Sequence, residues 1–195
     1  MENIVIVDCI RTGLAKSHRG TFNMTRSDDL VAHCIDALLA RNPQLDPGQV
    51  DDVVLGCGRQ IGEQSGNVAR HAVALSQLPI TVPATTVSRA CSSGLNSIAI
   101  AATQIASGCA EIMLAGGVES ITGLSRGTPG EFAENPRLMS EKPDMYMAMG
   151  NTAEVVARRY QVTREAQDAY ALSSQQRYAA AEAAGYIKDE IAPMT

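Results

Sequence analysis

The sequence predicts an α/β protein, in which buried strands alternate with helices over residues 1–120 of a chain of 195 residues. Three observations support this fold class. Short, nearly continuous apolar runs recur along this part of the chain, as in strands that are buried on both faces. Stretches with apolar residues at helical spacing lie between these runs. An alternation of strand and helix builds a layered structure around a sheet.

The first strand is expected at residues 4–10, which are almost all apolar. The polar, glycine-containing stretch after it predicts a loop. A helix should begin at Ser27, because two aspartates there precede apolar residues at helical spacing. Pro43 and the Pro47-Gly48 pair should end this helix.

Three further strands are expected at residues 53–57, 82–87 and 112–117. The first and the last are short apolar runs, and the second has Pro83 near its edge. Residues 67–75 have the pattern of a short helix. Cys91 opens a longer helix, which should end at Gly108, because glycine is common just after the last helical residue.

The character of the chain changes in residues 122–149, which are irregular and contain glycine, proline and several methionines. Loops of this length inside compact domains are usually functional. The remaining elements are expected to be helices at residues 152–160 and 163–184 and the start of a strand at 187–194. The chain therefore divides into an α/β domain, residues 1–120, and a mainly helical part, residues 121–195.

The composition argues against a nucleic-acid or membrane partner. The net charge is −5, and the lysines and arginines are scattered without a basic stripe. Residues 92–110 carry no charge, but they include Ser, Asn, Thr and Gln. We therefore interpret them as a helix inside the protein and not as a membrane span.

Five cysteines are spread along the chain, and none belongs to a Cys-x-x-Cys pair. An odd number at wide spacing argues against a disulfide framework or a zinc site. Residues 1–7 have no basic region of the kind that begins a secretory signal. These features predict a reduced, cytoplasmic protein without a bound metal.

The most informative stretch is residues 88–98, Ser-Arg-Ala-Cys-Ser-Ser-Gly-Leu-Asn-Ser-Ile, which indicates a strand end, a tight turn and a helix start. The helix has no charged face, so we expect it to be buried. The positive end of a helix dipole favours a thiolate, the form of cysteine that attacks. Cys91 is therefore the candidate catalytic nucleophile. We interpret the other cysteines as packing residues: Cys9, Cys34, Cys57 and Cys109.

Other residue types near these elements have simpler interpretations. Glu119 could act as a general base, but we prefer hydrogen bonds to local backbone that fix the turn. The Gly116-Gly117 pair is not a phosphate loop, since no Lys-Ser or Lys-Thr follows it, and it should allow close packing beside the Cys91 helix. We assign no catalytic role to the three histidines, which are His18, His33 and His71.

Six stretches, in order along the chain, resemble motifs of the thiolase family (acetyl-CoA C-acyltransferases): residues 5–12, 66–70, 89–95, 115–120, 149–154 and 164–176. The third stretch, Arg-Ala-Cys-Ser-Ser-Gly-Leu, is similar to the nucleophile motif. The fifth, Met-Gly-Asn-Thr-Ala-Glu, matches the family pattern M-G-x-T-A-E. One such motif alone would be weak, but six in order resemble a thiolase along the whole chain.

The resemblance implies a thiolase-like layered fold, with residues 121–195 forming part of the loop domain that covers CoA. It implies cleavage of 3-ketoacyl-CoA by free CoA, or the reverse Claisen condensation of two acyl-CoA molecules. Cys91 would carry the acyl group as a thioester. A histidine would activate it, a second cysteine would act as acid or base, and backbone amides would form an oxyanion hole. CoA thioesters are then substrates, and no separate cofactor is expected.

Some residues depart from the family's usual pattern. Ser88 stands where Asn is frequent, and Gly13 stands where Pro is usual. Ala148 precedes Met149 where many biosynthetic thiolases carry His, which favours a degradative enzyme or a longer acyl chain. We expect Met149 to contact the substrate, because a soft thioether suits variable acyl chains.

The second half of a thiolase carries a Gly-His-Pro histidine, an Asn-Glu-Ala-Phe motif and a Cys-x-Gly cysteine, and this sequence contains none of them. We therefore expect activity to need a C-terminal half, and we expect this chain to bind such a half or to form a homo-oligomer. Two alternatives stay open. One is a ketoacyl synthase-like condensing enzyme, against which Glu119-Ser120 and the M-G-x-T-A-E stretch argue. The other is a non-catalytic subunit that binds acyl-CoA or scaffolds a partner.

Overall fold

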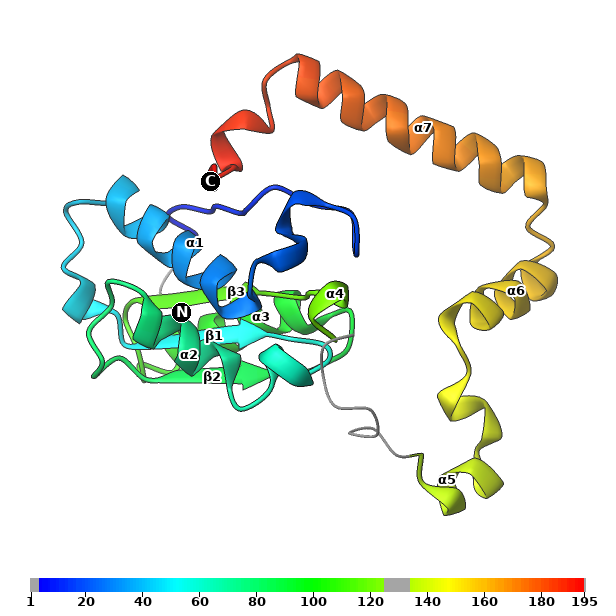
Figure 1. Ribbon diagram of the computed structural model, residues 1–195, viewed down its shortest axis with the longest axis horizontal. Coiled ribbons are helices and arrows are strands. Elements are labelled where there is room, and N and C mark those ends of the chain that lie inside the picture. Colours follow the sequence, from blue (N-terminus) through cyan, green and yellow to red (C-terminus); the bar gives the residue numbers. More distant parts are fainter. Residues whose placement is uncertain (1–3, 125–133, 195) are drawn as a thin grey trace. The chain divides into compact units, whose positions relative to one another are not determined.

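A computed structural model describes residues 4–124 and 134–194 of the chain. It contains two compact units, each described here by itself. One consists of residues 1–129 together with 190–195, and the other of residues 130–189. The first unit holds a sheet and its covering helices, and the described part of the second unit is helical (Figure 1).

A parallel sheet in the order β2-β1-β3 forms the centre of the first unit (Figure 1). Its strands are β1 (Asp52–Gly56), β2 (Ala84–Val87) and β3 (Met113–Gly117). β1 lies in the middle, and all its residues after Asp52 are buried. The strands expected at residues 53–57, 82–87 and 112–117 are therefore present, and β1 has the apolar residues that a strand covered on both faces needs.

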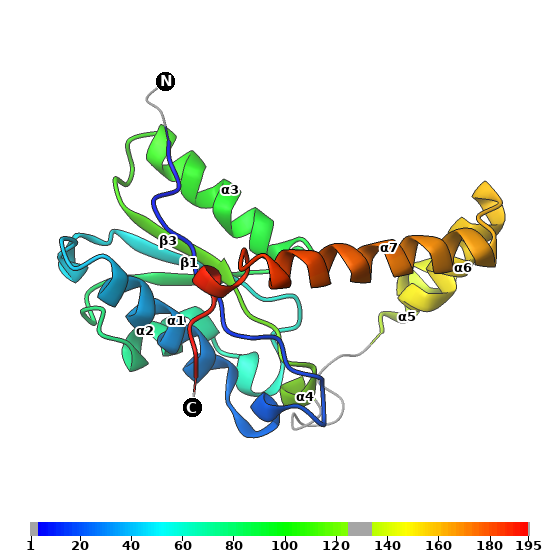
Figure 2. The ribbon, with the colours of Figure 1, turned by 90° about the horizontal axis from the view of Figure 1, so that it is seen from above.

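Helices cover both faces of this sheet (Figure 2). α1 (Ser27–Arg41) and α2 (Val68–Leu75) lie on one face, and α3 (Ser93–Ala106) lies on the other. Alternate residues of β1 point toward the first pair of helices. The buried core between them consists of Val31, Ile35, Leu39, Val50, Val53, Leu55, Cys57, Val68, Ala69, Ala72, Val73, Leu78 and Val82. The predicted α/β layers are thus confirmed.

Asn67 shows how the sequence places α2 against the sheet. It adopts a left-handed backbone conformation with φ of 67° and caps the helix, its Oδ1 accepting from the Arg70 amide. Its Nδ2 donates to the carbonyl of Ala84 in β2 over 3.0 Å. One asparagine therefore both starts the helix and joins it to the strand.

The N-terminal segment corrects the first expectation from the sequence. Residues 4–10 form no strand, and the side chains of Val5, Ile6 and Val7 are 70%, 77% and 80% exposed. A strand needs a neighbour whose backbone completes its hydrogen bonds, and no described residue pairs with the backbone of this segment. An apolar run identifies a candidate strand but does not supply that neighbour.

The strand expected at residues 187–194 is also absent, apart from one bridging residue. A 3-10 turn (Lys188–Glu190) is followed by Ile191, which forms an isolated parallel bridge with Arg11. The Arg11 amide donates to the carbonyl of Glu190 over 2.7 Å, and the Arg11 guanidinium donates to the Glu190 carboxylate. The Ala192 amide donates to the Arg11 carbonyl over 2.8 Å, so Arg11 joins the N-terminal segment to residues 190–192.

α3 differs from its prediction in two ways. It begins at Ser93, two residues after Cys91, and it is covered on one side only. Ser93, Ser97 and Ala101 are buried, whereas Leu95 is 73% exposed. The absence of charge marks a helix as suitable for burial, but a second layer must cover its outer face, and the described residues provide none.

The second unit contains α5 (Pro136–Glu141), α6 (Met149–Tyr160) and α7 (Arg164–Ala183). The two longer helices confirm the predictions, although α6 begins three residues earlier than expected. The Oγ of Thr163 accepts from the Ala166 amide over 3.2 Å and caps α7 as predicted. No side chain that the structure describes between residues 134 and 189 is fully buried.

The stretch expected to be irregular, residues 122–149, includes short helical segments. The short segments of the chain are α4 (Ile121–Leu124) and the 3-10 turns η1 (Thr21–Met24), η2 (Pro47–Gln49), η3 (Gly62–Gln64), η4 (Pro143–Tyr146) and η5 (Lys188–Glu190). Residues 125–133 lie outside the described part of the chain. None of the helices described has both the length and the apolar character needed to cross a membrane.

Candidate active site

Cys91 lies in an exposed turn at the carboxyl edge of the sheet. The turn, residues 88–93, connects the end of β2 to the start of α3 and is called the Cys91 turn below. Gly58 follows β1 and Glu119 follows β3, so residues of all three strands meet at this edge. In parallel α/β sheets, ligand sites form outside the carboxyl ends of the strands. The predicted nucleophile therefore occupies a position typical of a functional residue.

The backbone of the Cys91 turn is tightly constrained. Ala90 adopts a left-handed conformation with φ of 47°, which is uncommon for a residue with a side chain. The amide of Ser93 donates to the carbonyl of Ala90 over 3.1 Å. The Ser93 hydroxyl donates to the same carbonyl over 2.6 Å and accepts from the Arg89 amide over 2.8 Å. Ser93 thus holds both residues that precede Cys91.

Two paired glycines let the start of α3 approach the sheet. Gly56 and Gly117 lie opposite each other in β1 and β3. A Cβ atom on Gly56 would lie 2.3 Å from the carbonyl carbon of Ser93, and one on Gly117 would lie 3.4 Å from the Cα of Gly94. Of the Gly116-Gly117 pair, only Gly117 shows the close packing predicted beside the Cys91 helix, since a Cβ atom on Gly116 would meet the Leu55 side chain alone, at 3.8 Å. Gly56 has the strictest requirement of the three glycines.

Ser97 fixes α3 to the sheet one turn further along. Its side chain is fully buried, and its hydroxyl lies 2.7 Å from the carbonyls of Gly94 and Gly116. A buried hydroxyl needs such partners, because leaving it unpaired costs free energy. The register of α3 on β3, and with it the position of the Cys91 turn, is therefore set by specific polar contacts.

The side chain of Glu119 accepts a hydrogen bond from the backbone, as the sequence predicts. Its Oε2 accepts from the amide of Gly58 over 2.8 Å, and its Oε1 accepts from the Nε2 of Gln64 over 2.8 Å. No described hydrogen bond joins this carboxylate to Cys91. Neither Gly58 nor Gln64 is predicted as a site residue from the sequence, although Gly-Cys-Gly at the end of a buried strand is a signal of close packing.

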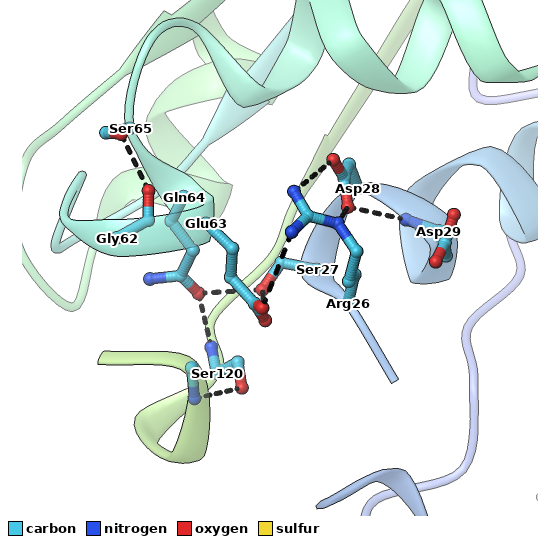
Figure 3. Close-up of polar contacts among 10 residues, drawn as sticks. Arg26, Ser27, Asp28, Asp29, Gly62, Glu63, Gln64, Ser65 and Ser120 are labelled. Carbon is cyan, nitrogen blue, oxygen red and sulfur yellow. Dashed lines mark hydrogen bonds and ion pairs between the residues drawn. The ribbon is translucent and has the colours of Figure 1, made fainter. Parts of the chain in front are cut away.

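Gln64 lies beside a polar cluster formed by the buried Ser27 and Asp28 and the half-exposed Arg26 (Figure 3). The fully buried Gln64 accepts from the Ser120 amide and from the hydroxyl of Ser27. The guanidinium of Arg26 donates to both carboxylate oxygens of Asp28, over 2.9 and 2.8 Å. Burial raises the pKa of Asp28, but the hydrogen bonds and charge of Arg26 more than offset this and hold the pKa below its ordinary value.

The five cysteines differ in their environments, and none is in a disulfide. Burial, with a smaller contribution from the charge of Glu119, raises the pKa of Cys57 to about 11. Burial also raises the pKa of Cys34. Cys9, Cys91 and Cys109 are exposed. Packing roles thus hold for Cys57 and Cys34, whereas the exposure of Cys9 and Cys109 contradicts the packing role predicted for them.

The histidines are not brought to the Cys91 turn by any hydrogen bond that the structure describes. His18 has a left-handed backbone conformation, and its amide donates to the hydroxyl of Thr122. The Nε2 of His33 is buried without a described partner. The described residues also contain no group of three or more His, Cys, Asp or Glu side chains placed to bind a metal.

A cavity of about 290 Å³ lies on the α1 side of the sheet. Its walls are mainly apolar and come from residues 10–14, α1, β1 and β3. Glu119 lines it, but Cys91 does not. Met149, the predicted substrate contact, belongs to the second unit, where it is the first residue of α6 and is exposed.

Comparison with known proteins identifies the family. A family model described as "Thiolase, N-terminal domain" matches residues 4–195. The chain is 42% identical over 195 residues to a 3-ketoacyl-CoA thiolase of Serratia proteamaculans and 44% identical over 195 residues to one of Bacillus subtilis. It is 43% identical over 214 aligned residues to a beta-ketoadipyl-CoA thiolase of Acinetobacter baylyi.

Each of these matches covers the whole of this chain, but only 50%, 49% and 52% of the respective relatives. The chain therefore spans about half the length of the curated relatives it matches. The family match includes the Cys91 turn, the glycines beneath it and the segment of Met149. The α/β layers and the cysteine at the carboxyl edge of the sheet agree with the match of the N-terminal domain model to residues 4–195. This chain therefore belongs to the thiolase family.

Proposed function

We propose that this chain provides the nucleophile of an acyl-CoA C-acyltransferase. The observation that carries the proposal is the position of Cys91, which is exposed in a constrained turn before an uncharged helix. A thiolate there would attack the 3-keto carbon of a 3-ketoacyl-CoA, and the bond between carbons 2 and 3 would break. The acyl group would remain on Cys91 as a thioester, and the departing acetyl-CoA carbanion would take up a proton.

Free CoA would complete the reaction by attacking the thioester on Cys91 and releasing a shortened acyl-CoA. Run in reverse, the same steps join two acyl-CoA molecules. The substrates are CoA thioesters, and this chemistry needs no metal or separate cofactor. The names of the relatives support a CoA thioester substrate. Met149 would contact the acyl chain, since its flexible thioether can adapt to different chains.

We further propose that a C-terminal thiolase half completes the site. The exposed face of α3 supports this partner, because it is apolar and uncharged next to Cys91, with Leu95 and Ile98 at its surface. Large exposed apolar patches mark interaction sites. The half-length match to the relatives supports the same occupant. We expect the assembled protein in a reducing, cytoplasmic compartment, in line with its five free cysteines.

The test is acyl transfer onto the full chain, with and without the C-terminal half of one of these relatives. The protein is incubated with acetyl-CoA, and peptide mass spectrometry locates any acetyl thioester. We expect Cys91 to be acetylated when the C-terminal half is present, and the Cys91→Ala variant to lose this adduct. Equal labelling of the exposed Cys9, Cys91 and Cys109 would contradict the proposal.

The same assay separates the alternatives. A ketoacyl synthase-like enzyme would take its acyl group from an acylated carrier protein, so acetyl-CoA and acetylated carrier protein are compared as donors. A non-catalytic subunit would bind acetyl-CoA without forming a thioester. Equilibrium dialysis with acetyl-CoA measures that binding, and the Cys91→Ala variant shows whether it depends on the thiol.

A further inference from the structure

We propose that Glu119 is a positioning residue, which sets the reactivity of Cys91 by holding the Cys91 turn through Gly58. The inference rests on the proposed role of Cys91 as the nucleophile. It gives a chemical role to a carboxylate that has no described hydrogen bond to the thiol. It also explains why the ends of β1 and β3 are joined by a side chain at the edge of the sheet where the turn lies.

The first step is the contact between Glu119 and Gly58. The carboxylate accepts from the Gly58 amide over 2.8 Å, and a Cβ atom on Gly58 would lie 2.8 Å from the same carboxylate oxygen. A hydrogen bond from a backbone amide to a charged group is stronger than one between neutral groups. Glu119 therefore fixes the position of the Gly58 backbone, which has no side chain that could interfere.

The second step leads from Gly58 to the turn. The Ser88 hydroxyl donates to the Gly58 carbonyl over 3.2 Å. A Cβ atom on Gly58 would also lie 3.2 Å from the carbonyl oxygen of Ala90, so this backbone is packed directly against the residue before Cys91. A movement of Gly58 would thus displace both the beginning of the turn and the peptide that precedes the thiol.

The third step concerns what holds Glu119 itself. Its second oxygen accepts from Gln64, whose Nε2 also donates to the carbonyl of Arg59 over 2.8 Å. Gln64 is fully buried, and its carbonyl oxygen accepts from Ser120, the residue after Glu119. Both the side chain and the following backbone of Glu119 are therefore tied to one buried amide (Figure 3 shows the link between Gln64 and Ser120).

The conformation of Ala90 explains why the turn needs this support. Its left-handed φ of 47° is costly for a residue with a Cβ atom, and such conformations persist only where surrounding contacts determine them. Ser93 supplies contacts from inside the turn, and Gly58 supplies one from outside. Without the outer contact, the turn can relax, and the thiol would leave its place next to the positive end of the α3 dipole.

The test measures alkylation of Cys91 relative to Cys109 by iodoacetamide in the full chain, near neutral pH. Both cysteines are exposed, so Cys109 is an internal reference within each sample. Glu119→Ala removes both acceptors, and we expect the Cys91-to-Cys109 rate ratio to fall about threefold, as for a lost helix-terminus interaction. Glu119→Gln keeps one acceptor oxygen and should lower the ratio less.

The sign of the change separates positioning from simple charge. Removing a negative charge near a thiol favours the thiolate, so a pure charge effect would raise the ratio. Asp36→Asn removes a carboxylate from α1, on the opposite face of the sheet from α3, keeps the acceptor for the Gln77 amide and should leave the ratio unchanged. Ser88→Ala, at an exposed position, removes the hydrogen bond to Gly58 and should lower the ratio in the same direction even if Glu119→Ala folds poorly.

An unchanged or higher ratio in folded Glu119→Ala overturns the inference. A lower melting temperature with an unchanged ratio does so as well, because it would show a role in stability alone. A wild-type ratio no greater than one is a different result, since it contradicts the proposed nucleophile itself. A ratio lowered by Glu119→Ala and Ser88→Ala, but not by Asp36→Asn, supports the positioning role.

Discussion

Cys91 and Cys109 lie at opposite ends of the same helix. Cys91 precedes the first residue of α3, Ser93, and Cys109 follows its last residue, Ala106, with both cysteines exposed. The positive end of the helix dipole is therefore next to Cys91 and the negative end next to Cys109. One helix thus presents two accessible thiols in opposite electrostatic settings.

This relationship predicts that Cys91 reacts faster than Cys109. A helix terminus contributes about 0.3 to 1 kcal/mol at each end, so the two thiols should differ about threefold to thirtyfold in alkylation rate. Iodoacetamide labelling with quantification of each cysteine peptide measures the ratio. The ratio should shrink in high salt, which screens the dipole. Equal rates at low salt would contradict the prediction.

Cys57 predicts a loss of stability at alkaline pH. Its pKa is raised from 9.0 to about 11 in the folded chain, so above pH 9 the unfolded state releases a proton that the folded state keeps. Stability should therefore fall as the pH rises from about 9 toward 11, by on the order of 2 kcal/mol. Urea unfolding across this range measures the slope. In the Cys57→Ala control the slope should be smaller, leaving the contribution of Cys34.

Gly56 and Gly116 lie in neighbouring strands, and adding a methyl group to each should change the free energy of unfolding differently. Gly56→Ala places a Cβ atom 2.3 Å from the Ser93 backbone and should cost about 1 to 3 kcal/mol of unfolding free energy. Gly116→Ala meets only the Leu55 side chain at 3.8 Å, so we expect a change between zero and a gain of about 1 kcal/mol. Thermal unfolding compares the two variants, and equal losses would show that α3 does not pack as described.

We expect the ion pair of Arg26 and Asp28 to contribute more to the free energy of unfolding than an exposed ion pair of the same chain. Arg26→Gln removes the charged partner of the buried Asp28 carboxylate, which keeps only the hydrogen bond from the Asp29 amide among those described, and should cost about 1 to 3 kcal/mol. The exposed pair of Arg164 and Asp168 is the matched control, and Arg164→Gln should cost about 0.5 kcal/mol or less.

The pH dependence of the same variant gives a second measurement. The folded-state pKa of Asp28 lies below its ordinary value of 3.8, so the stability it contributes is present above that value and is lost as the pH falls through the folded-state pKa. Acid unfolding curves should therefore be shallower in Arg26→Gln than in the wild type. An unchanged acid transition would show that Asp28 does not depend on Arg26.

The exposed face of α3 predicts where the C-terminal half binds. Leu95→Lys places a charge on this apolar face and should weaken the complex with the C-terminal half of a related thiolase at least tenfold, about 1.4 kcal/mol. Leu75→Lys, at an exposed position on the opposite side of the sheet, is the control and should leave binding unchanged. Calorimetric titration measures both affinities, and equal effects would place the interface elsewhere.

The sequence by itself determined the order of the elements around the site. The strand patterns located β1, β2 and β3, helical spacing located α1, the cysteine motif singled out Cys91 as a candidate, and six motifs in order indicated the family. These features are local, since each depends on the chemistry of a few neighbouring residues. The roles of Met149 as a substrate contact and of the C-terminal half as a partner are still predictions.

Only the tertiary structure decided which residues support the Cys91 turn. The sequence does not show what Gly56, Gly58 and Gln64 contact. They matter because strands distant in sequence bring them beside Ser93 and Glu119. The same reason explains the wrong strand at residues 4–10, because strand formation depends on a neighbouring backbone that an apolar run cannot specify. Sequence patterns thus determine what each segment can form, and pairing between segments determines what it does form.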